Sequence, residues 1–198
     1  WDVIPKAVDE YHQQLKAYPT QDIDAQVNNP VWHIHSGQVP ESKMVVSFAM
    51  LLNLASVAGA KDAAGLWGFI KKYAPDASPE THPDLDAAAG YALRYFNDKI
   101  APNRTYRLPT DPERAAILDL RNRLAAWDGA TDEESLQTAC YAVGKDHAFD
   151  PLRDWFKALY EVLMGASEGP RFGGFIALYG VPETIALIDK ALTGDLIA

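Results

Sequence analysis

The sequence predicts an all-α fold of about nine helices. Two observations carry this prediction. First, apolar residues recur every three or four positions, as on one face of a helix, for example at Ile117, Leu120, Leu124 and Trp127. Second, no segment combines several residues of strict apolar–polar alternation with β-branched enrichment, which is the pattern of a half-buried strand.

Four segments in the first half of the chain have helical spacing. They are Ala7–Tyr18, Ser42–Val57, Asp62–Tyr73 and Asp84–Lys99. The Ser42–Val57 segment is apolar almost all round, which predicts a central, buried helix.

Helix-boundary signals mark the second half. Asp111-Pro112 and Asp150-Pro151 each place an N-cap acceptor before a proline suited to the first helical position. Thr131 to Glu134 has the form of a capping box. Gly180, followed by Val-Pro-Glu, predicts the end of one helix and the start of the next.

Three segments rich in Pro, Asn or Asp are predicted linkers: Thr20–Pro40, Ala74–Pro83 and Ala101–Pro109. The first separates an N-terminal helix from the rest of the chain. We therefore predict a connector or stem-contact helix with its linker over residues 1–40, and a helical domain over residues 41–198.

Composition excludes several protein classes. The chain has 198 residues, a formal net charge of −9 and a single cysteine, so an internal disulfide scaffold is excluded. The longest apolar stretch, Phe48–Ala60, contains Asn53 and Ser56 and falls short of the roughly 20 residues of a membrane span. We expect a soluble, cytoplasmic protein without a membrane partner. Because the chain opens at Trp1, we also expect it to be part of a longer protein.

No motif predicts an active site or a metal site. His33–Ser36 and Lys43–Ser47 imitate the two ATP-binding signatures of aminoacyl-tRNA synthetases but lack the required glycine and the late lysine. Gly169–Gly174 lacks the lysine of a phosphate-binding loop. No motif near Cys140 supplies the general base that a nucleophilic cysteine needs. His33 and His35, two residues apart in a predicted loop without a nearby cysteine, indicate a metal site only weakly. We therefore predict no catalytic residue, metal ligand or cofactor in this chain.

A local excess of positive charge is the strongest functional signal. The window Arg94–Arg107 holds four cations against Asp98, a net charge of +3, interleaved with aromatic rings. Cations hold phosphates while rings and guanidinium planes stack on unpaired bases, so this composition suits RNA. The predicted contacts are Arg94, Tyr95, Lys99, Arg104, Tyr106 and Arg107. The alternative is an amphipathic helix whose rings face the core and whose cations are only solvated.

A second candidate contact is Arg171-Phe172, at a predicted helix start. Free backbone N–H groups and the helix dipole favour a phosphate there. The alternative is an ordinary helix N-terminus that binds no ligand.

Several longer strings, in order along the chain, resemble class I lysyl-tRNA synthetase. They are Phe48–Leu54, Leu66–Ile70, Tyr73–Pro75 with Ser78–Pro83, Gly90–Ala92 with Arg94–Phe96, Asp150–Phe156, and Gly169–Gly173 with Phe175–Gly180. The last of these is also similar to the end of the glutamyl-tRNA synthetase anticodon domain. The resemblance covers about Val3 to Leu192.

The resemblance implies an all-helical C-terminal region, an α-helix cage, that binds the anticodon stem-loop of tRNA-Lys. It implies a separate catalytic domain in which the full enzyme joins lysine to tRNA using ATP and Mg²⁺, while this fragment has no catalytic site. The alternatives are a helical protein-interaction module without RNA binding and, more distantly, a metal enzyme using His33 and His35.

Overall fold

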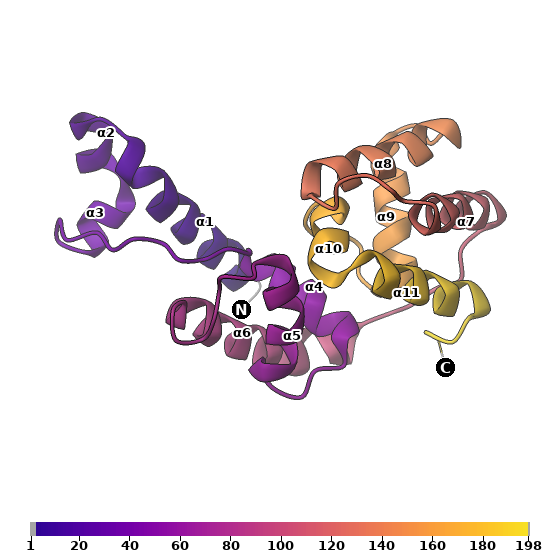
Figure 1. Cartoon of the computed structure of the whole chain (residues 1–198), viewed down its shortest axis with the longest axis horizontal. Coiled ribbons are helices and arrows are strands. Elements are labelled where there is room, and N and C mark those ends of the chain that lie inside the picture. Colours follow the sequence, from indigo (N-terminus) through magenta and orange to yellow (C-terminus); the bar gives the residue numbers. More distant parts are fainter. Residues whose placement is uncertain (1–2, 198) are drawn as a thin grey trace.

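The structure is a computed structural model that describes residues 3–197, and every regular element within that range is helical (Figure 1). The α-helices are α1 (Ile4–Ala17), α2 (Ile23–Asn28), α3 (Pro30–Ile34), α4 (Phe48–Ala58), α5 (Ala63–Tyr73), α6 (Pro83–Tyr95), α7 (Asp111–Ala125), α8 (Glu133–Asp146), α9 (Leu152–Leu163), α10 (Phe172–Tyr179) and α11 (Val181–Thr193). Nine of them have seven residues or more, which confirms the predicted all-α class. A π-helical turn, η2 (Phe96–Ile100), extends α6.

The chain builds an arm and two lobes (Figure 1). The arm is α1–α3. The first lobe is α4–α6, with a core that includes Leu51, Leu54, Leu66, Ile70 and Leu85. The second lobe is α7–α11, with a core that includes Leu120, Leu136, Trp155, Phe172 and Phe175. The predicted division at residue 40 stays a prediction.

Helix α4 begins six residues later than predicted. Ser47 is its N-cap, and the Ser47 hydroxyl accepts the Met50 N–H at 3.1 Å. The carboxylate of Asp9 accepts the N–H groups of Phe48 and Ala49 at 2.6 and 3.1 Å. A side chain of the arm thus helps to fix where the central helix starts, which local periodicity does not indicate.

Three of the predicted helix starts are displaced by one residue. Thr110 is the N-cap of α7 and forms a capping box with Glu113, so Asp111 is already helical. Asp132, not Thr131, caps α8: its Oδ1 accepts the Glu134 and Ser135 N–H groups, both at 3.0 Å. Pro151 occupies the N-cap position of α9, after a cis bond to Asp150. The boundary at Gly180 is confirmed, since α10 ends there with φ of 109° and α11 follows directly.

The predicted linker Thr20–Pro40 is not wholly irregular, because α2 and α3 lie inside it. Asp22 and Asn29 cap these two helices by accepting the N–H groups of Ala25 and Val31. Helices of six and five residues are too short to display a helical hydrophobic period, which is why the sequence pattern misses them.

Within residues 3–197, no single helix is long and apolar enough to cross a membrane, and only α10 with α11, bent by 112°, would pass together by length and composition. In the same range no three His, Cys, Asp or Glu side chains gather as a metal ion would require.

Candidate nucleic-acid interface

Helix α6 places a cation and an aromatic ring together on its exposed side. Tyr91 and Arg94 are three residues apart and share one face. The Arg94 guanidinium carbon lies 4.9 Å from the centroid of the Tyr91 ring, and Tyr91 is 58% exposed. The pair is therefore a cation–π stack presented to solvent.

This pair borders an open cavity of about 730 Å³, which we call the α6 groove. Its lining is Ile4 and Val8 of α1, Phe48 of α4, Asp84, Ala87, Ala88, Tyr91, Arg94 and Tyr95 of α6, and Asp98 and Lys99 of η2. The walls are mainly apolar, and two cations and two carboxylates border them. Tyr95 packs edge-on against Phe48, with ring centroids 6.5 Å apart.

Arg104 is directed into the protein rather than outward. Its Nε donates to the Met164 carbonyl at 2.9 Å and its Nη1 to the Ser56 carbonyl at 3.0 Å. Its guanidinium carbon lies 5.4 and 4.5 Å from the ring centroids of Phe96 and Tyr106. Burial lowers the pKa of Arg104. Because Ser56 belongs to the first lobe and Met164 to the second, Arg104 joins the two lobes.

Arg107 is bound to two carboxylates. Its Nη1 and Nη2 donate to Glu113 at 2.6 and 2.7 Å, and its Nε donates to Glu161 at 2.7 Å. The hydrogen bonds to Glu113, first, and to Glu161 raise the pKa of Arg107. The charge of Arg107 is thus neutralised within the second lobe, where it ties the segment before α7 to α9.

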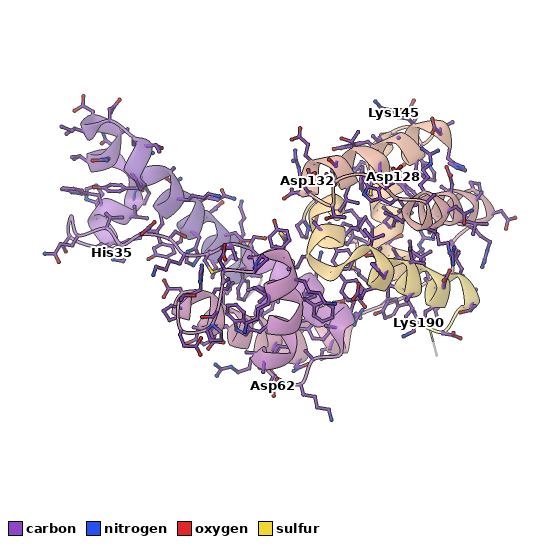
Figure 2. The ribbon with its side chains drawn as sticks, in the orientation of Figure 1. His35, Asp62, Asp128, Asp132, Lys145 and Lys190 are labelled. Carbon is purple, nitrogen blue, oxygen red and sulfur yellow. The ribbon has the colours of Figure 1, made fainter. Side chains whose placement is uncertain are left out.

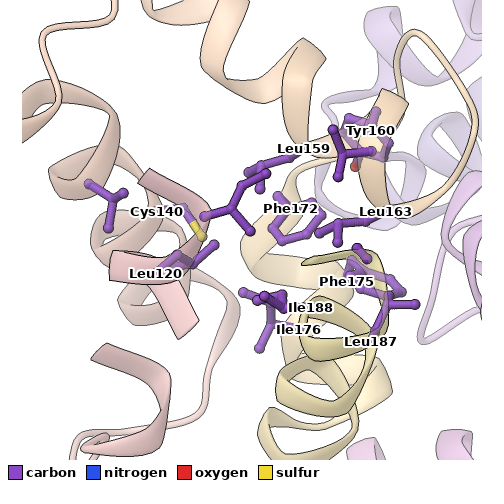
Figure 3. Packing of buried hydrophobic residues seen from close by; sticks show 14 of the residues in the cluster. Leu120, Cys140, Leu159, Tyr160, Leu163, Phe172, Phe175, Ile176, Leu187 and Ile188 are labelled. Carbon is purple, nitrogen blue, oxygen red and sulfur yellow. The ribbon is translucent and has the colours of Figure 1, made fainter. Parts of the chain in front are cut away.

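Arg171 and Phe172 lie in different environments. The Arg171 side chain is 69% exposed and lies 3.9 Å from Glu133. It lines a cavity of about 430 Å³, which we call the arm–lobe cleft. Its lining comes from the arm, the first lobe with the segment before it, and the second lobe: Asp9, His12, Gln13 and Lys16; Ser42, Met44, Val45, Val46, Ser47, Met50 and Tyr73; and Glu133, Pro170 and Arg171. Phe172 is fully buried among Tyr160, Phe175 and their neighbours (Figure 3). Its ring is not available to stack on a base.

The start of α10 is also occupied by the protein itself. The Gly173 N–H donates to Gln137 Oε1 of α8 at 2.7 Å, and the Glu133 carboxylate packs beside Gly174. A neighbouring carboxylate opposes an anion, so this helix start lacks the open, electropositive character of a phosphate site.

The predicted contacts therefore lie in five different places. Arg94, Tyr95 and Lys99 lie together on the α6 groove. Arg104 and Tyr106 lie at the junction of the lobes, Arg107 within the second lobe, Arg171 in the arm–lobe cleft and Phe172 in the second core. The set omitted Tyr91, whose three-residue spacing from Arg94 was the available signal.

The motifs that imitated active-site elements serve local packing. His35 Nε2 shares a hydrogen bond of 2.8 Å with the Tyr11 hydroxyl, which ties α3 to α1. Lys43 Nζ donates to the Thr81 carbonyl at 3.3 Å. Cys140 is fully buried in the second core, and burial raises the pKa of its thiol to about 12.

Comparison with known proteins gives matches along the whole chain. It is 63% identical to a lysine–tRNA ligase of Roseobacter denitrificans over 198 residues, all of this chain and 37% of that protein. It is 43% identical to the lysine–tRNA ligase of Rickettsia felis over 194 residues and of Rickettsia akari over 195 residues, again 37% of each relative. No family model matches. The chain spans little more than a third of the length of these curated relatives, and its homology to lysine–tRNA ligases extends over its full length.

Proposed function

We propose that this chain is the anticodon-binding region of a lysine–tRNA ligase and that it binds the anticodon stem-loop of tRNA-Lys. The observation that carries the proposal is the 63% identity with a lysine–tRNA ligase over all 198 residues. The relatives support a role in lysyl-tRNA synthesis. An all-helical chain of this kind also agrees with the α-helix cage implied by the resemblance to class I enzymes.

The exposed cation–ring stack on the α6 groove supports a contact with unpaired RNA. A base can stack on the Tyr91 ring or the Arg94 guanidinium plane, and a cation can hold its phosphate. The proposed RNA contacts are therefore Tyr91, Arg94, Tyr95 and Lys99 on the groove, and Arg171 in the cleft.

The junction residues take a different role in this proposal. Arg104 and Arg107 are bound to carbonyls and carboxylates of the protein, and Tyr106 covers Arg104. Phe172 is a core residue. We assign all four to holding the two lobes and the second core, on which the exposed contacts depend.

The remaining part of the enzyme would carry the chemistry. We propose a class I catalytic domain elsewhere in the full protein, using ATP and Mg²⁺ to attach lysine to tRNA in the cytoplasm, with this chain supplying recognition.

Titration of a labelled tRNA-Lys anticodon stem-loop tests the proposal. We expect Tyr91→Ala and Arg94→Ala to weaken binding by about 1–3 kcal/mol where a base stacks. Arg121→Ala is the matched control, because Arg121 is engaged with Asp189 on the second lobe at 3.0 Å. Losses below about 0.3 kcal/mol for both groove variants, well under a stacking contribution, would remove the groove from the RNA interface.

A further inference from the structure

Helix α9 borders a further groove, with an excess of positive charge in its lining, that the sequence did not single out. It is a cavity of about 400 Å³, here called the α9 groove, lined by Arg153, Phe156, Lys157, Tyr160, Ser167, Glu168 and Gly169. Two cations face one carboxylate in this lining, so its net charge is +1 within a chain of −9.

The α9 groove and the arm–lobe cleft meet at one loop. Residues 167–169 line the groove, and the next two residues, Pro170 and Arg171, line the cleft. The Tyr160 hydroxyl donates to the Pro170 carbonyl and so fastens this loop to α9. The cleft and the groove therefore share this loop as part of their walls.

The two cations on α9 are arranged along one face. Arg153 and Lys157 are four residues apart, about 6 Å along the helix axis, so both can face successive groups of an extended strand. Arg153 is exposed and forms no ion pair within residues 3–197. Lys157 lies 3.6 Å from Glu161, but the Glu161 carboxylate already accepts the shorter 2.7 Å bond from Arg107. Both cations can therefore meet an external anion.

Aromatic side chains border the same face. Tyr141 of α8 is 40% exposed and packs edge-on against Phe156, with centroids 5.0 Å apart. Lys145, one turn beyond Tyr141, extends from the outer end of α8 (Figure 2). Cations beside a partly exposed pair of aromatic rings can bind the phosphates and sugars of RNA, whereas an apolar partner would leave these cations without an anion.

We propose that the α9 groove binds the phosphodiester backbone of an RNA strand, with Arg153 and Lys157 holding phosphates, and that it continues the arm–lobe cleft. This rests on the proposed function and adds a backbone contact outside the α6 groove. Such a contact positions RNA and carries no sequence information.

The test is stem-loop affinity measured at several salt concentrations for Lys157→Ala and Arg153→Ala. A phosphate contact contributes about one unit to the slope of log affinity against log salt. We expect each variant to lower that slope by about one, and to weaken stem-loops with different anticodons equally. Arg121→Ala is the matched control, since it also removes one positive charge and Arg121 pairs with Asp189 on the second lobe, outside the lining of either groove.

An unchanged slope and affinity in both variants, while the unaltered chain still binds the stem-loop, would overturn this inference and leave the proposed function standing. An equal loss in Arg121→Ala would also overturn it, because the effect would then be one of net charge. Absence of stem-loop binding by the full-length enzyme would overturn both proposals.

Discussion

The guanidinium of Arg107 holds both carboxylate oxygens of Glu113, at 2.6 and 2.7 Å. Glu113 also accepts the Thr110 N–H at 2.8 Å as part of the capping box of α7. One carboxylate thus caps a helix and neutralises a cation that the sequence suggested for RNA.

This relationship predicts an acid-sensitive contribution to stability. The hydrogen bond from Arg107, first, and those from Thr110 lower the pKa of Glu113 from 4.5 to about 2. A lowered folded-state pKa gives stability that is complete above about pH 4.5 and is lost as the pH falls toward 2. We expect Glu113→Gln to reduce the free energy of unfolding at pH 7 by about 1–2 kcal/mol, allowing for the partial exposure of Arg107.

Urea unfolding between pH 7 and pH 2.5 measures this effect. The difference in the free energy of unfolding between the unaltered chain and Glu113→Gln should become smaller as the pH falls. Glu10→Gln, which breaks an exposed pair on α1, is the control and should cost no more than about 0.5 kcal/mol. A difference that stays constant over the whole pH range would contradict the assignment.

Arg104 should be more important for stability than other arginines that bond a carbonyl. Arg104→Ala leaves the carbonyls of Ser56 and Met164 without this donor and removes a cation from between two rings, so we expect a loss of about 2–4 kcal/mol. Arg114→Ala, which removes one bond to the Leu192 carbonyl, should cost about 1 kcal/mol. Chemical denaturation of both variants checks the order, and equal losses would argue against Arg104 as the joint between the lobes.

Two glycine substitutions should have opposite effects. A Cβ at Gly173 would lie 2.6 Å from the Cα of Gln137, so Gly173→Ala must push α10 away from α8 and should cost about 1–3 kcal/mol. Gly68 lies inside α5 with nothing within 4 Å of such a Cβ, and Gly68→Ala should stabilise by about 0.5–1 kcal/mol. The melting temperatures of the two variants test both effects. A Gly173→Ala protein as stable as the unaltered chain would refute the close packing of α10 against α8.

Cys140 should react only when the second lobe opens. Its side chain is fully buried and its thiol pKa is raised to about 12, so the reactive thiolate is scarce at neutral pH. We expect a thiol reagent at pH 7.5 to leave the native protein unmodified and to label it completely in denaturant, as read by intact mass. Rapid stoichiometric labelling of the native protein would contradict this packing.

The helices could be predicted from sequence because their information is local. The stripe through Ile117, Leu120 and Leu124 defines α7, and Gly180 ends α10 through its own backbone conformation. Local sequence patterns do not predict a helix boundary that is fixed by a residue far away in the chain. The start of α4 depends on Asp9, 39 residues before Phe48.

The candidate site shows the same limit. Composition identified a cationic, aromatic window, but it could not separate Arg94, which faces solvent, from Arg104, whose acceptors lie 48 and 60 residues away. Phe172 resembled an exposed partner of Arg171, yet its burial depends on contacts with Tyr160 and other side chains of the second core. The three-residue spacing of Tyr91 and Arg94 on one helix could have predicted the stack that the structure presents, but Tyr91 was not among the predicted contacts.

We propose that this chain binds the anticodon of tRNA-Lys and distinguishes its bases. The most direct test is fluorescence anisotropy with the UUU stem-loop of tRNA-Lys beside a stem-loop whose second and third anticodon bases are changed. Both are titrated at two salt concentrations, with the isolated chain and with the full-length enzyme. We predict salt-sensitive binding that weakens clearly for the altered loop. Equal binding of both loops, or no binding by either protein, would contradict the claim, and the second outcome would favour a protein-interaction module.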